Sequence, residues 1–167
     1  MRCLLVLLLA GLAAWLSIAV FNNITDPGTN QVLLGHMLSM DLLSMDHQLG
    51  QGLVWHAWPA KWVPSLLHAV IGFQLCVAAG LWAAALAFAR AVVSNELRRF
   101  RQARVVAIAA LSCFLLLWLW FACGGLWFGY WIKQGAVQVV HMTLILITLS
   151  SLLYVQSGLP SEAGKTL

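Results

Sequence analysis

Long apolar stretches alternate with short polar ones along the whole chain. Four of them cover about residues 3–21, 66–93, 105–131 and 136–155. About 20 apolar residues in a helix span the ~30 Å hydrocarbon layer of a bilayer. Lipid offers no partner to backbone N–H and C=O groups, so such stretches must be helical. The pattern therefore predicts an all-α fold, an integral membrane four-helix bundle.

The first apolar stretch needs separate treatment, because Arg2 followed by apolar residues resembles the beginning of a signal peptide. The stretch is longer than a typical signal core. It ends in Phe21, and no small-residue cleavage pattern precedes Asn22. We therefore expect it to be retained as a transmembrane helix.

The long polar connection over residues 22–65 carries its own helical pattern. Asp26, Pro27 and Gly28 favour a turn. Apolar residues then recur at helical spacing over about residues 30–49, which predicts an extra interfacial helix that lies on the membrane surface or caps the bundle. Leu-Ser-Met-Asp occurs at residues 38–41 and again at 43–46, but five residues is not the period of a known repeat architecture.

Length and composition bound the organisation of the chain. Its 167 residues suffice for one transmembrane domain over residues 1–156, and the polar residues 157–167 are expected to form a flexible cytoplasmic tail. The chain is 62% hydrophobic and only 8% charged. Its net charge of +4 does not form a basic stripe with interleaved aromatic residues, so we expect no nucleic-acid partner.

The distribution of charge predicts the topology. Basic residues mark the cytoplasmic side of a membrane protein. Five arginines surround the connection between the second and third spans, whereas the 22–65 connection carries three aspartates and one lysine. We therefore expect both termini in the cytoplasm and the interfacial helix on the outer side. The arginines are Arg90, Arg98, Arg99, Arg101 and Arg104.

Polar residues within or beside the spans are the candidate site residues, since a polar group in lipid requires a partner. Those on the outer side are expected at similar depth and predict a polar cluster that could bind a ligand. They are Asn22, Asn23, Asp26, His68, Gln138 and His141. The simpler interpretation is that these groups satisfy one another by hydrogen bonds between helices.

His68 and His141 raise the question of a cofactor. Two histidines at one depth on different helices could ligate a haem through both imidazoles, or could hydrogen-bond a quinone head. We favour the absence of a cofactor. We also expect no metal site, because His36 and His47 would lie ~16 Å apart along one helix.

Two further patterns bear on function. No arrangement of Ser, Cys, His and Asp supports a catalytic site, and no acidic residue lies deep in a span, which weakens a transporter that relays protons. Gly72, Cys76, Gly80 and Ala84 recur every four residues and predict the close approach of a neighbouring helix, either within the chain or from a partner.

Several segments resemble a known family. These are Phe21-Asn22-Asn23-Ile24-Thr25-Asp26, the His36–Asp41 segment and the Gly124–Phe128 segment. The chain is similar over about residues 10–155 to the bacterial predicted small integral membrane proteins, a family of unknown function. That family often carries acidic residues near the positions of Gln74 and Leu126, which are uncharged here. The resemblance implies a four-helix protein and no activity, and it leaves residues 22–26 as the best remaining candidate site.

Together these patterns lead to an expected function. We expect a small protein of the bacterial inner (plasma) membrane, in contact with the lipid bilayer, that serves as an accessory or assembly subunit of a larger membrane complex through a membrane-protein partner or self-association. One alternative is a redox protein that binds quinone or haem through His68 and His141. Another is a small transporter.

Overall fold

A computed structural model describes residues 2–46 and 48–157. His47 and residues 158–167 of the expected tail lie outside the described residues. The helices in chain order are α1 (Arg2–Thr25), α2 (Pro27–Ser39), α3 (Asp41–Ser44), η1 (Gln51–His56), η2 (Ala60–Trp62), α4 (Val63–Ser94), α5 (Leu97–Trp127), η3 (Tyr130–Ile132) and α6 (Gly135–Ser157).

The four expected spans fall on α1, α4, α5 and α6. Among the described residues, these four helices are long and apolar enough to cross a membrane. The part of the chain that the structure describes contains no strand, so the expected helical membrane bundle is confirmed. The third span ends at Trp127 and not at residue 131, because Gly129 adopts a φ of 62° and turns the chain into η3.

The long helices pack in the order in which they occur along the chain. α1 packs on α4, α4 on α5, and α5 on α6. Small residues allow the α4–α5 contact to be close: the Cα of Gly80 faces Ala110, and Ala84, Ala91 and Ala107 are fully buried. Half of the expected ridge of small residues is thus used within the chain. Gly72 and Cys76, in its other half, are exposed.

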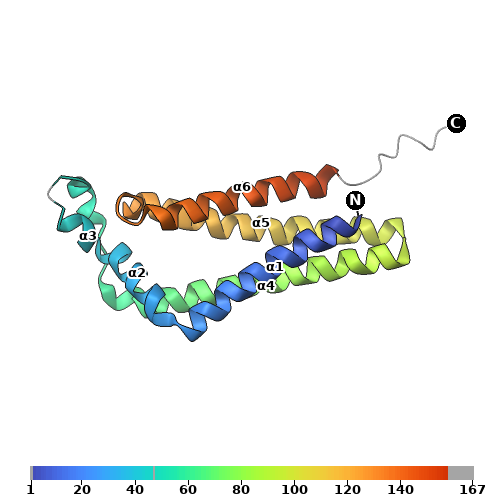
Figure 1. The fold of residues 1–167 in the computed structure, drawn as a ribbon, viewed down its shortest axis with the longest axis horizontal. Coiled ribbons are helices and arrows are strands. Elements are labelled where there is room, and N and C mark those ends of the chain that lie inside the picture. Colours follow the sequence, from blue (N-terminus) through green and yellow to red (C-terminus); the bar gives the residue numbers. More distant parts are fainter. Residues whose placement is uncertain (1, 47, 158–167) are drawn as a thin grey trace.

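The two ends of the bundle differ in chemistry. We call the end with the α4–α5 turn the arginine end and the opposite end, with α2 and α3, the loop end (Figure 1). At the arginine end, Arg2 Nη1 donates to Asn95 Oδ1 at 2.6 Å, and its guanidinium lies 4.3 Å from the ring centre of Phe100. Arg104 Nη2 donates to the Gln156 carbonyl at 2.9 Å. These contacts tie α1 to the α4–α5 turn and α5 to the end of α6.

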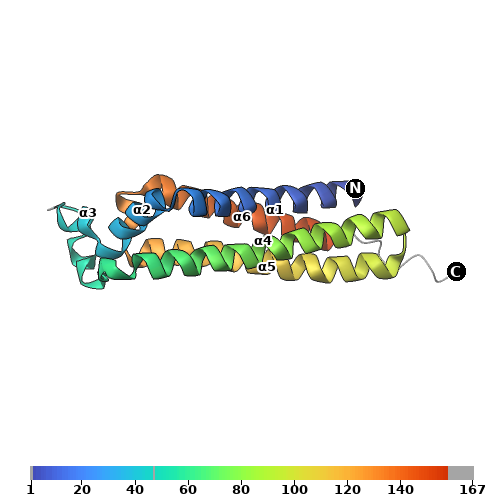
Figure 2. The ribbon, with the colours of Figure 1, turned by 90° about the horizontal axis from the view of Figure 1, so that it is seen from below.

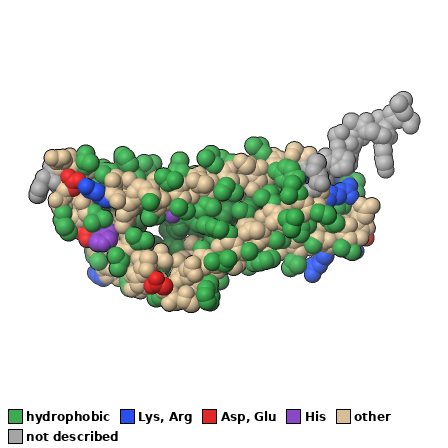
Figure 3. Space-filling model, viewed as in Figure 1, with side chains coloured by type: hydrophobic (Ala, Val, Ile, Leu, Met, Phe, Trp, Pro, Cys, Tyr) green, Lys and Arg blue, Asp and Glu red, His purple; other side chains and the backbone are tan. Residues whose placement is uncertain are grey.

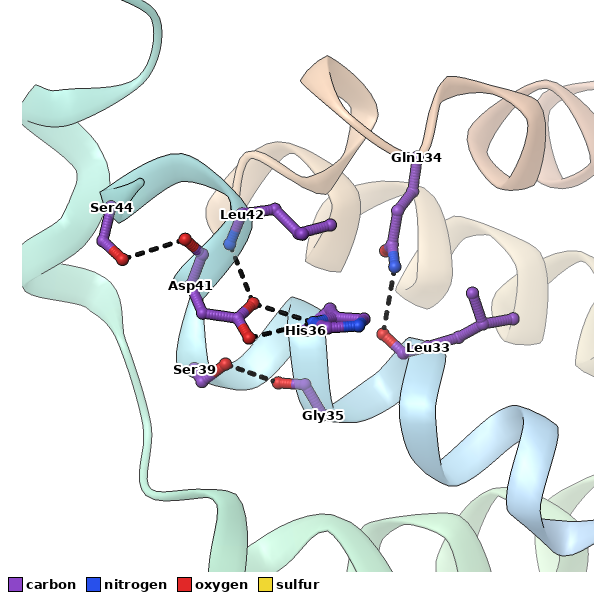
Figure 4. Close-up of polar contacts among 8 residues, drawn as sticks. All are labelled: Leu33, Gly35, His36, Ser39, Asp41, Leu42, Ser44 and Gln134. Atoms are coloured by element: carbon purple, nitrogen blue, oxygen red, sulfur yellow. Dashed lines mark hydrogen bonds and ion pairs between the residues drawn. The ribbon is translucent and has the colours of Figure 1, made fainter. Parts of the chain in front are cut away.

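The single helix expected over residues 30–49 is two helices in the structure. α2 begins at Pro27, because the Asp26 side chain accepts from the Thr29 backbone N–H and caps the helix. It ends where Met40 adopts the left-handed conformation, with a φ of 51°. The Asp41 carboxylate then accepts from the Leu42 N–H at 2.8 Å and begins α3 (Figure 4).

The second half of the Leu-Ser-Met-Asp duplication ends the helical stretch. Asp46 Oδ1 accepts from the backbone N–H groups of Gln48 and Leu49, at 2.8 and 3.2 Å, which turns the chain away from the helical path. Each aspartate of the duplicated sequence therefore marks a point where the backbone changes direction.

The bundle is open on one side. α6 packs along α5, but among the described residues it makes no comparably extensive contact with α1. The pair α1–α4 and the pair α5–α6 diverge toward the loop end, where α2 lies across them (Figures 1 and 2). The space beneath α2 is therefore bounded by the two helix pairs, and α2 forms its roof.

Candidate ligand cavity

A cavity of about 470 Å³ lies beneath α2 at the loop end, between the two helix pairs. Figure 3 shows the hollow from the side on which the pairs diverge. Small-molecule sites in proteins commonly occupy roughly 300–1,000 Å³. Its described lining is Ala19, Asn23, Asn30, Leu33, Leu34, Met37, Leu38, Trp58, Leu66, Leu67, Val70, Gln74, Trp118, Trp120, Phe121, Gly124, Phe128, Tyr130, Gln134, Val137, Val140 and His141.

One wall of the cavity carries a chain of amides. Asn30 Nδ2 donates to Asn23 Oδ1 at 2.7 Å, and Asn23 Nδ2 donates to Gln74 Oε1 at 2.8 Å. Gln74 is only 4% exposed. Because these residues belong to α2, α1 and α4, the chain joins three helices and gives the buried amide of Gln74 a partner.

The opposite wall carries an imidazole and a phenol. His141 Nδ1 lies 2.8 Å from the Tyr130 hydroxyl, which also lies 3.1 Å from the Phe121 carbonyl. The His141 ring is stacked with Trp118 at 5.6 Å between ring centres and contacts Phe121 at 5.0 Å. The imidazole is thus held in place by two aromatic rings and one hydrogen bond.

The electrostatic character of the cavity is neutral. Among the described residues that line it there is no Lys, Arg, Asp or Glu. Its polar side chains are amides, one phenol, one imidazole and the indole N–H groups of tryptophans, and the rest of the lining is apolar. A charged ligand would lose its hydration here without gaining an opposite charge, which is costly.

The roof of the cavity is attached to both helix pairs. Gln134 Nε2, just before α6, donates to the Leu33 carbonyl at 3.4 Å (Figure 4). The Trp58 N–H donates to the Leu38 carbonyl at 2.7 Å, and the amide chain through Asn30 holds the beginning of α2. α2 is therefore a fixed part of the site.

Outside the cavity, charged pairs stabilise the loop end. His36 Nδ1 lies 2.9 Å from both carboxylate oxygens of Asp41 (Figure 4). Partial burial raises the pKa of Asp41, but hydrogen bonds from His36 and the Leu42 N–H outweigh it, so this pKa lies below its ordinary value. Lys133 forms an ion pair with Asp46, which joins the loop to the segment before α6.

The candidate residues from the sequence separate into two groups. Asn23 and His141 line the cavity on opposite walls. Gln138 does not line it, and its Nε2 donates to the Ala122 carbonyl at 3.4 Å. Asn22, Asp26 and His68 are exposed and do not line it. Asp26 acts as a helix cap, and hydrogen bonds from the Thr29 side chain and backbone hold its pKa below the ordinary value.

Several cavity residues were not among the candidates, including Asn30, Gln74, Trp118 and Tyr130. Gln74 is the one amide in the apolar segment over residues 66–93, and that isolation could have marked it. Within the described residues, no group of three His, Cys, Asp or Glu side chains is placed to hold a metal ion.

Comparison with known proteins gives a family and no activity. Residues 1–157 match the family described as predicted small integral membrane protein (DUF2165), and the chain belongs to that family. No curated protein and no solved structure matches the chain.

Proposed function

We propose that this small integral membrane protein is a binding protein that holds a lipid-soluble molecule with a neutral polar head in the cavity beneath α2. The observation that carries the proposal is the lining of the cavity. It is mostly apolar, has hydrogen-bonding groups on two facing walls, and includes no Lys, Arg, Asp or Glu among the described residues. Such a lining matches a molecule with an apolar body and a few polar atoms.

The open side of the bundle supports uptake from the bilayer. α1 and α6 do not pack together as the other neighbouring helices do, and the hollow is visible on that side (Figure 3). A lipid-soluble molecule could reach the cavity between these helices without passing through water.

The proposal can be tested by a substitution that fills the cavity at a position with room for a larger side chain. Gly124 lines the cavity, and a Cβ added there meets no atom within 4 Å. We expect Gly124→Leu to fold normally and to lose lipid-soluble molecules that co-purify with the wild type in a mild detergent, as measured by native mass spectrometry. Gly11→Leu is the matched control, since Gly11 is exposed, equally unobstructed and outside the cavity. Equal retention by all three proteins would contradict the proposal.

The same proposal includes a location and an orientation. We place the protein in the inner (plasma) membrane of a bacterium with both termini in the cytoplasm. The support is the arginine end, where the five arginines of the sequence analysis lie on α4 and α5 beside the turn that joins these helices. The cavity then lies near the outer leaflet.

A second candidate function is that of an accessory or assembly subunit of a larger membrane complex. The observation that favours it is the uncovered half of the small-residue ridge on α4, where Gly72 and Cys76 are exposed. A partner helix could approach closely there. We expect a stoichiometric partner to co-purify at native expression and Gly72→Leu to release it, with Gly11→Leu again as control. A clean monomer after mild solubilisation would count against this role.

Haem ligation by both histidines is not part of the proposal. His68 is exposed on α4 and lies outside the cavity that His141 lines. A transporter is not proposed either, because no feature of the cavity beyond its polar walls favours one.

A further inference from the structure

We infer that the cavity binds a quinone-type ring, in both its quinone and its quinol form, with a ring oxygen at His141. This inference rests on the proposed function, because it specifies the head of the lipid-soluble molecule. It draws on the charge, the shape and the hydrogen-bonding groups of the cavity walls.

The first argument is the neutrality of the cavity. Membrane lipids with phosphate heads, fatty acids and amines all carry charge near neutral pH. Burial of such a head beside the amides and rings of this lining would lack a compensating charge. Quinones and quinols are neutral, and their oxygens need only hydrogen bonds.

The second argument is the aromatic lining around His141. Trp118 is stacked with the imidazole at an interplanar angle of 25°, and Phe121 and Tyr130 lie 5.0 and 6.3 Å from it between ring centres. Trp120 and Phe128 also belong to the lining. Aromatic rings pack favourably against another flat ring at such distances.

The third argument is the pairing of Tyr130 and His141, which allows two hydrogen arrangements with the same number of protons. In one, Tyr130 donates to the Phe121 carbonyl, His141 Nδ1–H donates to Tyr130, and Nε2 is a bare acceptor. In the other, Tyr130 donates to Nδ1, and Nε2 carries the proton and is a donor. Nε2 has no hydrogen-bond partner among the described residues, so it remains for a ligand.

These two arrangements match the two forms of a quinone head. A quinol hydroxyl donates to Nε2 in the first arrangement, and a quinone carbonyl accepts from Nε2–H in the second. The opposite wall supplies further donors, because the side-chain NH₂ groups of Asn23 and Asn30 each use one hydrogen in the amide chain. Groups on both walls can therefore meet oxygens at opposite edges of one ring.

Trp118 adds an unpaired donor to the same wall. Its side chain is 3% exposed, and Nε1 has no hydrogen-bond partner. A buried donor without a partner is unusual in a folded protein. Nε1 is itself shielded from the cavity, so a ring carbonyl would accept from it only if the Trp118 side chain turned toward the ligand.

The experiment compares three probes that share one chain length. They are a decyl-substituted benzoquinone, its quinol, and decylbenzene, which has the ring and the chain but no oxygen. Binding to the purified full-length protein in nanodiscs is measured by competition. We expect the quinone and the quinol each to bind at least about tenfold more tightly than decylbenzene, because each can complete buried hydrogen bonds.

Two matched variants test whether His141 is the residue that recognises the ring oxygens. His141→Phe keeps an aromatic ring and removes both nitrogens, so we expect it to erase the preference for the oxygenated rings and to leave decylbenzene binding unchanged. Retained decylbenzene binding also shows that the variant is folded. His68→Phe makes the same change outside the cavity, and we expect it to bind all three probes as the wild type does.

The outcomes distinguish this inference from the proposed function. Wild-type protein that binds decylbenzene as tightly as the quinone would overturn the inference and leave the proposed binding of apolar molecules in place. Binding of none of the probes would overturn both. A loss of preference in His68→Phe would also overturn the inference.

Discussion

Asn22 and Asn23 are adjacent in the chain and have different surroundings. Asn22 is exposed, whereas Asn23 donates to the buried Gln74 and accepts from Asn30. The sequence alone treated the two as equal candidates, because their difference depends on which face of α1 meets α4. The contact between these helices decides it.

This difference leads to a first prediction. Asn23→Leu leaves the Gln74 oxygen without its partner, and we expect the free energy of unfolding to fall by about 1–3 kcal/mol. Thermal unfolding in detergent measures it, with Asn22→Leu as the control near the wild-type value. The double variant Asn23→Leu/Gln74→Leu removes both polar partners and should recover most of the loss. A double variant less stable than Asn23→Leu would contradict this account of the amide chain.

Asp46 supports a prediction about pH. Hydrogen bonds from Lys133, and then from the Gln48 and Leu49 N–H groups, lower the pKa of Asp46 from 3.8 to about 2. Because the folded-state pKa lies below the unfolded value, the carboxylate stabilises the fold above pH 3.8, and this contribution is lost as the pH falls toward 2. Asp46→Asn removes the charge and keeps the backbone acceptor. We expect Asp46→Asn to unfold at a lower temperature than the wild type at pH 7, and this difference in unfolding temperature should narrow between pH 4 and 2. A difference that stays constant with pH would refute the stabilising role of the Asp46 carboxylate.

At the scale of elements, apolar length predicts the long helices well and the loop end poorly. The stretches over residues 3–21, 66–93 and 136–155 lie within α1, α4 and α6, because backbone groups in lipid allow no alternative. The break within residues 30–49 depends on Met40 in a left-handed conformation, which a methionine seldom adopts. No local residue preference indicates it, and tertiary packing of the fully buried Leu38 and the nearly buried Met40 is what holds it.

The turn after α5 gives a prediction at this scale. Gly129 has a φ of 62°, and a Cβ there would lie 2.9 Å from Leu43 Cδ1 and 3.0 Å from Leu53 Cδ1. We expect Gly129→Ala to destabilise the fold by about 2 kcal/mol, from the left-handed backbone together with the displaced leucines. Gly135→Ala adds the same methyl group at the beginning of α6, where a Cβ meets nothing within 4 Å, and should leave the unfolding temperature nearly unchanged. Equal losses of stability from Gly129→Ala and Gly135→Ala, measured by thermal unfolding in detergent, would argue against this account of the turn.

At the scale of the whole molecule, the orientation can be tested directly. In a chain whose four cysteines are replaced by alanine, Gln48→Cys places a thiol at the loop end and Gln102→Cys places one at the arginine end, both at exposed positions. We expect a membrane-impermeant thiol reagent added to intact cells to label residue 48 and not residue 102. The reverse labelling would invert the proposed topology.

The sequence does not predict the cavity itself. A helix that is apolar all round gives no signal of which face meets lipid and which meets another helix. The sequence therefore predicted a polar cluster, but it could not show that α1 and α6 remain apart. The predicted members were Asn22, Asn23, Asp26, His68, Gln138 and His141. Nor could the sequence show that His68 faces away from the cavity.

The ties at the arginine end have a mechanical consequence. α1 and α6 are each secured there, by the contacts of Arg2 and Arg104, and they diverge from that point. α6 has 23 residues and is therefore roughly 35 Å long, so a tilt of about 5° about its secured end moves the far end by roughly 3 Å. Such a tilt would stretch the hydrogen bond from Gln134 to the Leu33 carbonyl, which joins the α5–α6 pair to α2 at the loop end. The lateral pressure of the surrounding lipid would then act against this bond in setting the separation of α1 and α6 beside the cavity.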